Sequence, residues 1–137
     1  MVTPRIVIVA GGLELATRLG RNLGQQGKAR IILVDACLTH IWKPLLHEVA
    51  AGTINSYEDE LNYFAHASQN HFEFQLGRFE GVDRDEKIIT LAPLCDSHGK
   101  PLANARHLQY DWLVMAIGST SNDFGTEGAR EHCIFLD

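Results

Sequence analysis

The apolar positions near the start of the chain follow two periods, and each predicts a different kind of element. Residues 6–9 and 31–34 are short apolar runs without alternation, which is typical of parallel strands buried on both faces. Between these runs the apolar residues have a helical spacing and comprise Leu13, Leu15, Ala16, Leu19 and Leu23. A strand–helix–strand unit with a parallel sheet is therefore expected.

A second helix is expected to begin at Ser56, whose side chain can cap its first turn. Acidic residues follow at once, where they complement the helix dipole. The buried side of this helix is expected to comprise Tyr57, Leu61, Phe64 and Ala65.

From His71 the period changes to two, because apolar and polar residues alternate along residues 72–76. Further strand-like stretches follow at residues 79–82, 87–91 and 108–110. Period-two segments separated by polar turns predict a small antiparallel β-meander, inserted after the strand–helix–strand unit.

Residues 110–119 return to an apolar run that ends in small residues. This is typical of a buried parallel strand whose tip passes close to a ligand, although a tight turn alone would also explain Gly118. The predicted fold class is thus α/β. We expect residues 1–70 to hold the βαβ unit, residues 71–109 the meander, and residues 110–137 the returning strand and the start of a linker.

Composition narrows the classes of function. A chain of 137 residues with a net charge of −5 and no basic cluster argues against nucleic-acid binding. Cys37, Cys95 and Cys133 are far apart and form no C-x-x-C pair, so they are interpreted as reduced thiols, buried or incidental. The pair at 47–48 begins like a zinc-binding H-E-x-x-H helix, but Ala51 replaces the second histidine, which excludes zinc there.

A turn of three residues, Ala10, Gly11 and Gly12, joins the first predicted strand to the first helix. Dinucleotide-binding proteins use G-x-G-x-x-G at this place, where glycines let the backbone approach a pyrophosphate at the helix N-terminus. A three-residue turn can connect the two elements but can hardly also wrap a pyrophosphate. Three interpretations remain open: a deletion, a loop missing from the given sequence, or a turn that never bound a nucleotide.

Asp35 lies at the end of the second predicted strand and follows Gly12 by 23 residues. The acid that binds a nucleotide ribose is expected about 20 residues after the glycines. The alternative is that Asp35 caps a turn, as aspartates often do.

Several stretches together resemble the flavin-binding N-terminal part of the type II NADH dehydrogenases, which are single-subunit, non-proton-pumping NADH:quinone oxidoreductases of the two-dinucleotide-binding flavoprotein superfamily. The similarity extends over essentially the whole chain. It rests on residues 12–20, 42–52, 110–114, 118–119, 122–125 and 135–137. The stretch WKPLLHEVAAG at 42–52 is the most specific, because the superfamily shares the others.

The resemblance implies a Rossmann-like FAD-binding domain and assigns roles to individual residues. Gly11 and Gly12 would begin the helix that faces the FAD pyrophosphate, and Asp35 would bind the adenosine ribose. Lys43, with the turn at 44–45, would lie beside the isoalloxazine ring. The remaining cofactor-binding positions implied by the family are Phe79 near the adenine, and Ala116 and Gly118 near the flavin. No catalytic side chain and no metal ligand are assigned.

The chain also departs from the family pattern. Relatives carry about three further glycines between the positions of Val9 and Ala10, and these would touch phosphate. The family's second nucleotide domain, its returning FAD segment, its quinone pocket and its C-terminal membrane-associating region are not in this sequence. We therefore expect a fragment that is incomplete at its C-terminus and inactive by itself.

For the full-length protein, the resemblance implies hydride transfer from NADH to FAD and passage of two electrons to a quinone. It also implies peripheral association with the cytoplasmic face of the inner membrane and allows a homodimer. An alternative is a non-catalytic Rossmann-like module whose shortened turn no longer binds FAD. A sulfide:quinone-type relative is a weaker alternative, because it would need paired redox cysteines at the flavin.

Overall fold

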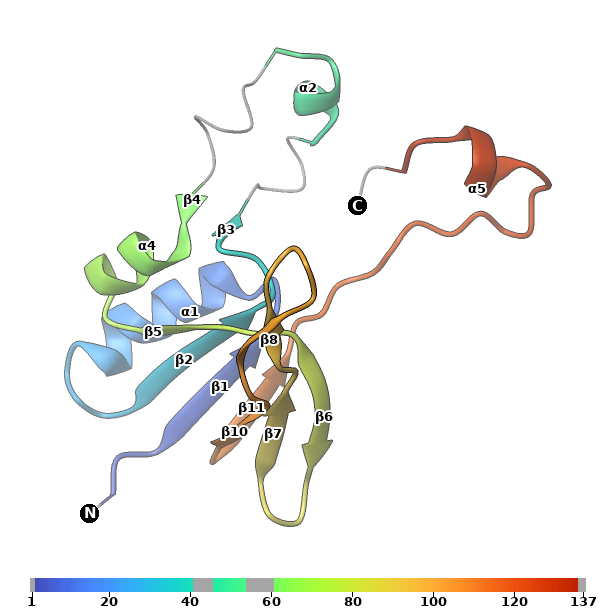
Figure 1. Ribbon diagram of the computed structural model, residues 1–137. Coiled ribbons are helices and arrows are strands. Elements are labelled where there is room, and N and C mark those ends of the chain that lie inside the picture. Colours follow the sequence, from blue (N-terminus) through green and yellow to red (C-terminus); the bar gives the residue numbers. More distant parts are fainter. Residues whose placement is uncertain (1, 41–45, 54–60, 136–137) are drawn as a thin grey trace.

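The computed structural model describes residues 2–40, 46–53 and 61–135 of the chain (Figure 1). Its helical elements are α1 (Leu13–Leu19), the π-helix η1 (Gly20–Gly24), α2 (Leu46–Ala50), α4 (Tyr63–Gln69) and α5 (Ala129–His132). Its strands are β1 (Arg5–Val9), β2 (Arg30–Asp35), β3 (Thr39–His40), β4 (Leu61–Asn62), β5 (Glu73–Leu76), β6 (Phe79–Asp83), β7 (Ile88–Leu91), β8 (Leu94–Cys95), β9 (Pro101–Ala103), β10 (Arg106–Gln109) and β11 (Trp112–Met115).

A parallel sheet of four strands, in the order β11-β1-β2-β5, forms the centre of the fold. Strand β1 pairs with β2 on one side and with β11 on the other, and β2 pairs with β5. Val7 and Ile8 of β1 point to opposite faces and both are completely buried, as is Leu33 of β2. The predicted α/β class with a Rossmann-like parallel sheet is confirmed.

Helical elements cover one face of this sheet (Figure 1). Ile8, Leu33 and Tyr63 form the core there, together with Ala16 of α1. Ala16 is buried as predicted, but Leu15 is 37% exposed and lies outside that core. Leu13, Leu19 and Leu23 also pack against this core, so the apolar stripe is narrower than the sequence indicates by Leu15 alone.

A small antiparallel sheet, in the order β10-β7-β6, covers the opposite face. Ile89 and Leu91 of β7 pack with Val7 and Val9 of β1 in a second buried cluster. The period-two pattern of these strands reflects the one face that each turns toward the central sheet.

Two sequence predictions differ from the structure, and a third lies outside the residues that the structure describes. Strand β5 pairs in parallel with β2, so the prediction that residues 72–76 form an antiparallel strand is wrong. Helix α4 begins at Tyr63 with Asn62 as its cap, while the predicted start at Ser56 lies outside the described residues. The buried residues of α4 are Tyr63 and Ala67. The predicted buried side is therefore wrong, because Phe64 and Ala65 are exposed and Leu61 lies in β4.

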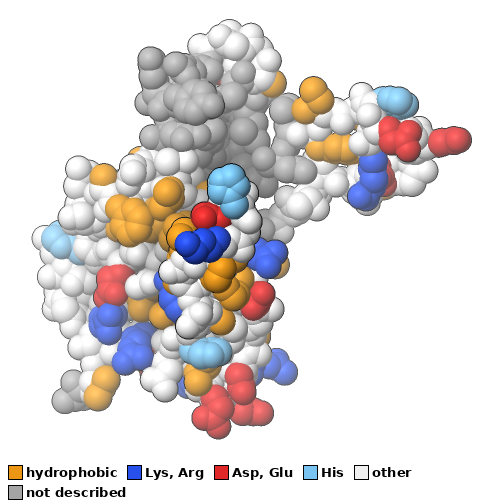
Figure 2. Space-filling model, in the orientation of Figure 1, with side chains coloured by type: hydrophobic (Ala, Val, Ile, Leu, Met, Phe, Trp, Pro, Cys, Tyr) orange, Lys and Arg blue, Asp and Glu red, His pale blue; other side chains and the backbone are white. Residues whose placement is uncertain are grey.

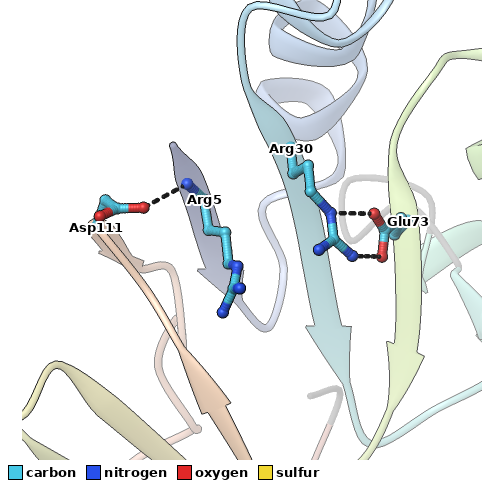
Figure 3. Close-up of polar contacts among 4 residues, drawn as sticks. All are labelled: Arg5, Arg30, Glu73 and Asp111. Carbon is cyan, nitrogen blue, oxygen red and sulfur yellow. Dashed lines mark hydrogen bonds and ion pairs between the residues drawn. The ribbon is translucent and has the colours of Figure 1, made fainter. Parts of the chain in front are cut away.

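Hydrogen-bonded polar pairs join neighbouring strands of the central sheet near their amino ends (Figure 3). The guanidinium of Arg30 on β2 donates from Nε to Oε1 of Glu73 on β5 at 2.9 Å and from Nη2 to Oε2 at 3.0 Å. The backbone N–H of Arg5 on β1 donates to Oδ2 of Asp111, just before β11, at 2.7 Å. These pairs join strands that are distant in sequence.

The chain leaves the sheet after β11 and extends as an arm that carries α5 (Figure 1). Phe124 and Ile134 on this arm are 88% and 92% exposed. Figure 2 shows apolar side chains on the arm as well as on the body of the molecule. The predicted return of the chain as a parallel strand is confirmed by β11, but this strand is an edge strand whose Trp112 and Met115 are exposed.

Candidate functional site: the carboxyl edge of the parallel sheet

A pocket of about 340 Å³ lies where β1 and β2 end, at the carboxyl edge of the parallel sheet. Ligands of open α/β sheets bind at this edge, because the loops that leave the strands diverge there. The residues that line the pocket are Val9, Ala10, Val34, Asp35, Ala36, Gly77, Arg78, Phe79 and Ile117. The structure thus brings Asp35 and Phe79, two of the predicted site residues, together with the turn after β1.

The turn of residues 10–12 is tight and strained. Ala10 has a φ of 63°, in the left-handed region that side chains with a Cβ avoid. Its N–H donates to the carbonyl of Val34 at 2.7 Å, and its carbonyl accepts the N–H of Gly12. Two of the three backbone donors of this turn are therefore used within the protein.

Gly11 and Gly12 allow close backbone packing. A Cβ on Gly12 would overlap Cγ2 of Ile8, which is rigid because Ile is β-branched. A Cβ on Gly11 would lie 3.3 Å from the carbonyl oxygen of Ala116. The N–H of Ala116 in turn donates to the carbonyl of Val9 at 2.9 Å. The glycine turn therefore lies directly beside the chain that leaves β11.

Three hydrogen bonds fix Asp35. Its Oδ1 accepts the N–H of Cys37 at 3.0 Å, and its Oδ2 accepts the hydroxyl of Tyr63 at 3.0 Å. Its backbone carbonyl accepts the N–H of Gly77 at 2.8 Å. The carboxylate at the wall of the pocket is thus held in one orientation.

Tyr63 is the partner of Asp35 that the sequence did not reveal. Its side chain is 1% exposed, and its ring stacks on that of Phe74 with centroids 4.7 Å apart. Burial raises the pKa of the Tyr63 hydroxyl, and the nearby charge of Asp35 raises it further. Tyr63 is therefore neutral and is a hydrogen-bond donor at physiological pH.

The other predicted site residues have different positions. Ala116 is half-buried against the glycine turn, and Gly118 is exposed with a φ of 67°. Lys43 and the turn at 44–45 lie outside the described residues. The site residues predicted from the sequence did not include Arg78, which lines the pocket from the loop between β5 and β6. Ile117 also lines the pocket and lies between the predicted residues Ala116 and Gly118.

The cysteines considered from the sequence are not among the described residues that line this pocket. Cys37, Cys95 and Cys133 are all exposed, so of the two interpretations, buried or incidental, the buried one is wrong. The described part of the chain contains no group of three side chains suited to hold a metal ion. Within residues 2–40, 46–53 and 61–135, no helix is long and apolar enough to cross a membrane.

The family model for the pyridine nucleotide-disulphide oxidoreductases matches residues 5–137. The chain belongs to this family, a class that agrees with its parallel sheet and with a pocket at the carboxyl edge. The predicted resemblance to the type II enzymes is also confirmed. A type II NADH:quinone oxidoreductase of Haemophilus influenzae is 49% identical over 135 residues, which are 96% of this chain and 30% of that protein.

More distant relatives agree with this placement. A type II NADH:quinone oxidoreductase of Staphylococcus aureus is 30% identical, again over 96% of this chain and 30% of that protein. The chain thus spans about 30% of the length of these curated relatives.

Solved structures with lower sequence identity share the fold. NDH2 of Plasmodium falciparum, solved in complex with NADH, has a TM-score of 0.71 at 19% identity, over 95% of this chain and 25% of that one. The sulfide:quinone oxidoreductase of Aquifex aeolicus has a TM-score of 0.70 at 22% identity, over 93% of this chain and 27% of that one.

Proposed function

We propose that this chain is the FAD-binding portion of a type II NADH:quinone oxidoreductase. The single observation that carries the proposal is the pocket at the carboxyl edge of the sheet, where Asp35 and Phe79 meet beside the glycine turn. The names of the curated relatives support NADH and a quinone as the substrates of the whole protein.

The residues around the pocket fit the adenosine end of FAD. The oriented carboxylate of Asp35 can accept a ribose hydroxyl, since each carboxylate oxygen can accept more than one hydrogen bond. Phe79 at the start of β6 offers an apolar wall for a flat base. The glycine turn beside Ala116 is the place for the diphosphate, in contact with the first turn of α1.

FAD, when bound, supplies the chemistry for accepting a hydride from NADH and for passing electrons to a quinone. The chain's own residues would bind and orient it: Asp35 at the ribose, Gly11 and Gly12 at the diphosphate, and Lys43, Ala116 and Gly118 toward the flavin. No side chain of this chain is proposed as an acid or base. Fragment inactivity, peripheral membrane association and a homodimer remain predictions for this protein and its full-length form.

Titration of the purified chain with FAD, followed by flavin fluorescence, tests this proposal. Asp35→Asn keeps the shape of the side chain but removes its charge, so we expect the Kd for FAD to rise about tenfold. Asp83→Asn is the matched control, because Asp83 lies in the β6–β7 hairpin and accepts the N–H groups of Asp85 and Glu86. Equal effects of both substitutions would contradict the role of Asp35.

A second candidate function is a non-catalytic Rossmann-like module that binds no FAD. The observation that favours it is the short turn, in which Ala10 is strained and the N–H groups of Ala10 and Gly12 are already used. The same titration separates the two candidates. A chain that is folded by circular dichroism and does not bind FAD would support the module and reject the flavoprotein proposal.

A further inference from the structure

We propose that Tyr63 is a positioning residue, whose buried hydroxyl orients the carboxylate of Asp35 to recognise the ribose hydroxyls of an adenosine-containing ligand. This inference rests on the proposed function, since it concerns the same pocket. It adds a residue that lies 28 positions from Asp35 in sequence and does not line the pocket itself.

The two hydrogen bonds to the carboxylate of Asp35 come from different parts of the fold. The N–H of Cys37 belongs to the turn directly after β2, so it restrains only Oδ1 and moves with the same loop. The Tyr63 hydroxyl comes from α4 and restrains Oδ2 independently of that loop. With one donor on each oxygen, the plane of the carboxylate is fixed, and the remaining lone pairs are available to a ligand.

The position of Tyr63 is fixed by contacts of its backbone, of its helix and of its ring. Its backbone N–H donates to the carbonyl of Leu38 at 3.1 Å, which ties the start of α4 to the loop after β2. The cap residue Asn62 accepts the N–H of Ala65 at 3.2 Å and fixes the first turn of the helix. The ring stacks on Phe74 of β5 with an interplanar angle of 11°. The hydroxyl therefore has little freedom to leave Asp35.

This rigidity has a consequence for specificity. A carboxylate that is already oriented loses less conformational freedom when a ribose hydroxyl binds. The difference in affinity between ligands with and without that hydroxyl is therefore larger. The neutral Tyr63 hydroxyl has only one proton, and it donates this proton to Oδ2 of Asp35. The hydroxyl therefore cannot also donate a hydrogen bond to the ligand. Tyr63 acts through Asp35.

The test compares two probes, adenosine and 2′,3′-dideoxyadenosine, by isothermal titration calorimetry on the whole chain. We expect the wild-type protein to bind adenosine at least tenfold more tightly. Tyr63→Phe keeps the stacked ring and removes only the hydroxyl, and we expect it to reduce this ratio to threefold or less. Its affinity for the dideoxy probe should stay within twofold of wild type, a result that a purely structural role would not produce. Tyr110→Phe, in a tyrosine that is not part of this pocket, is the matched control and should leave the ratio unchanged.

The outcomes separate this inference from the proposed function. An unchanged ratio in Tyr63→Phe, with normal discrimination by wild type, would overturn the positioning role alone. A wild-type protein that binds neither probe, or both equally, would reject the ribose role of Asp35 and this inference with it.

A second measurement does not depend on the folding of the variant. The hydroxyl proton of a buried, hydrogen-bonded tyrosine exchanges slowly enough to be followed by NMR in the wild-type protein. We expect adenosine to shift the Tyr63 hydroxyl proton and the dideoxy probe to leave it in place. Equal shifts with both probes would overturn the positioning role.

Discussion

At the scale of single residues, the turn after β1 carries a local conflict. Ala10 takes a left-handed conformation that glycine adopts without cost, while the two glycines that follow are needed for close packing against Ile8 and Ala116. The strain lies one residue before them, at the wall of the pocket. Ala10 is the first residue of the three-residue connection between β1 and α1.

Ala10→Gly is therefore expected to stabilise the chain. Relief of the left-handed strain contributes about 1–2 kcal/mol, and the extra freedom of glycine in the unfolded chain offsets about 0.4–1 kcal/mol of this. We expect the free energy of unfolding to rise by about 0.5–1 kcal/mol, measured as a higher midpoint in urea. Ala103→Gly, in β9 with an ordinary φ, is the matched control and should lower the midpoint. A lower midpoint for Ala10→Gly would show that the turn is not strained.

At the scale of elements, one hydrogen bond joins α1 to α4. The hydroxyl of Thr17 donates to the carbonyl of Leu13 at 2.8 Å, so its oxygen must accept from Nε2 of His66, also at 2.8 Å. In its neutral form, His66 therefore carries its proton on Nε2. Burial lowers the pKa of His66, and the positive charge of Arg21 lowers it further.

This arrangement predicts a loss of stability at mildly acidic pH. Because the pKa of His66 is lower in the folded than in the unfolded chain, the unfolded chain binds the proton first. The contribution of His66 is therefore complete above its ordinary pKa of about 6.5 and declines as the pH falls toward the folded value.

Urea denaturation between pH 7.5 and 5 measures this decline. His66→Gln keeps a donor for Thr17 but does not titrate, and it should make the denaturation midpoint less dependent on pH over this range. His98→Gln, in the exposed loop between β8 and β9, is the control and should behave like wild type. A His66→Gln protein with the wild-type pH profile would contradict the prediction.

The sequence predicts which segments form strands and helices better than it predicts which of these elements contact one another. Unalternating runs identify β1 and β2, because strands buried on both faces have no polar side, and the end of β2 then locates Asp35. The alternation along β5 indicates one buried face, but it does not determine whether the neighbouring strand is parallel or antiparallel. The contact between Tyr63 and Asp35 depends on how α4 packs on the sheet, which no local pattern encodes.

At the scale of the whole molecule, apolar side chains remain at the edge of the central sheet. Within the described residues β11 pairs only with β1, so its outer edge has unpaired backbone groups. Trp112 on this strand is 68% exposed, and Ile117 just beyond it is 64% exposed. Exposed strand edges beside apolar side chains are typical sites of association.

The purified chain is therefore expected to self-associate through the β11 edge. Burial of most of an indole side chain stabilises a contact by about 2–3 kcal/mol, so Trp112→Lys should weaken the association at least about tenfold. Leu102→Lys on β9 is the matched control, because Leu102 is 69% exposed but lies away from the central sheet, and this change should leave the association constant as it is. Light scattering over a concentration series measures both variants. A monodisperse wild-type monomer, or an equal effect of Trp112→Lys and Leu102→Lys, would show that copies of the chain do not associate through β11.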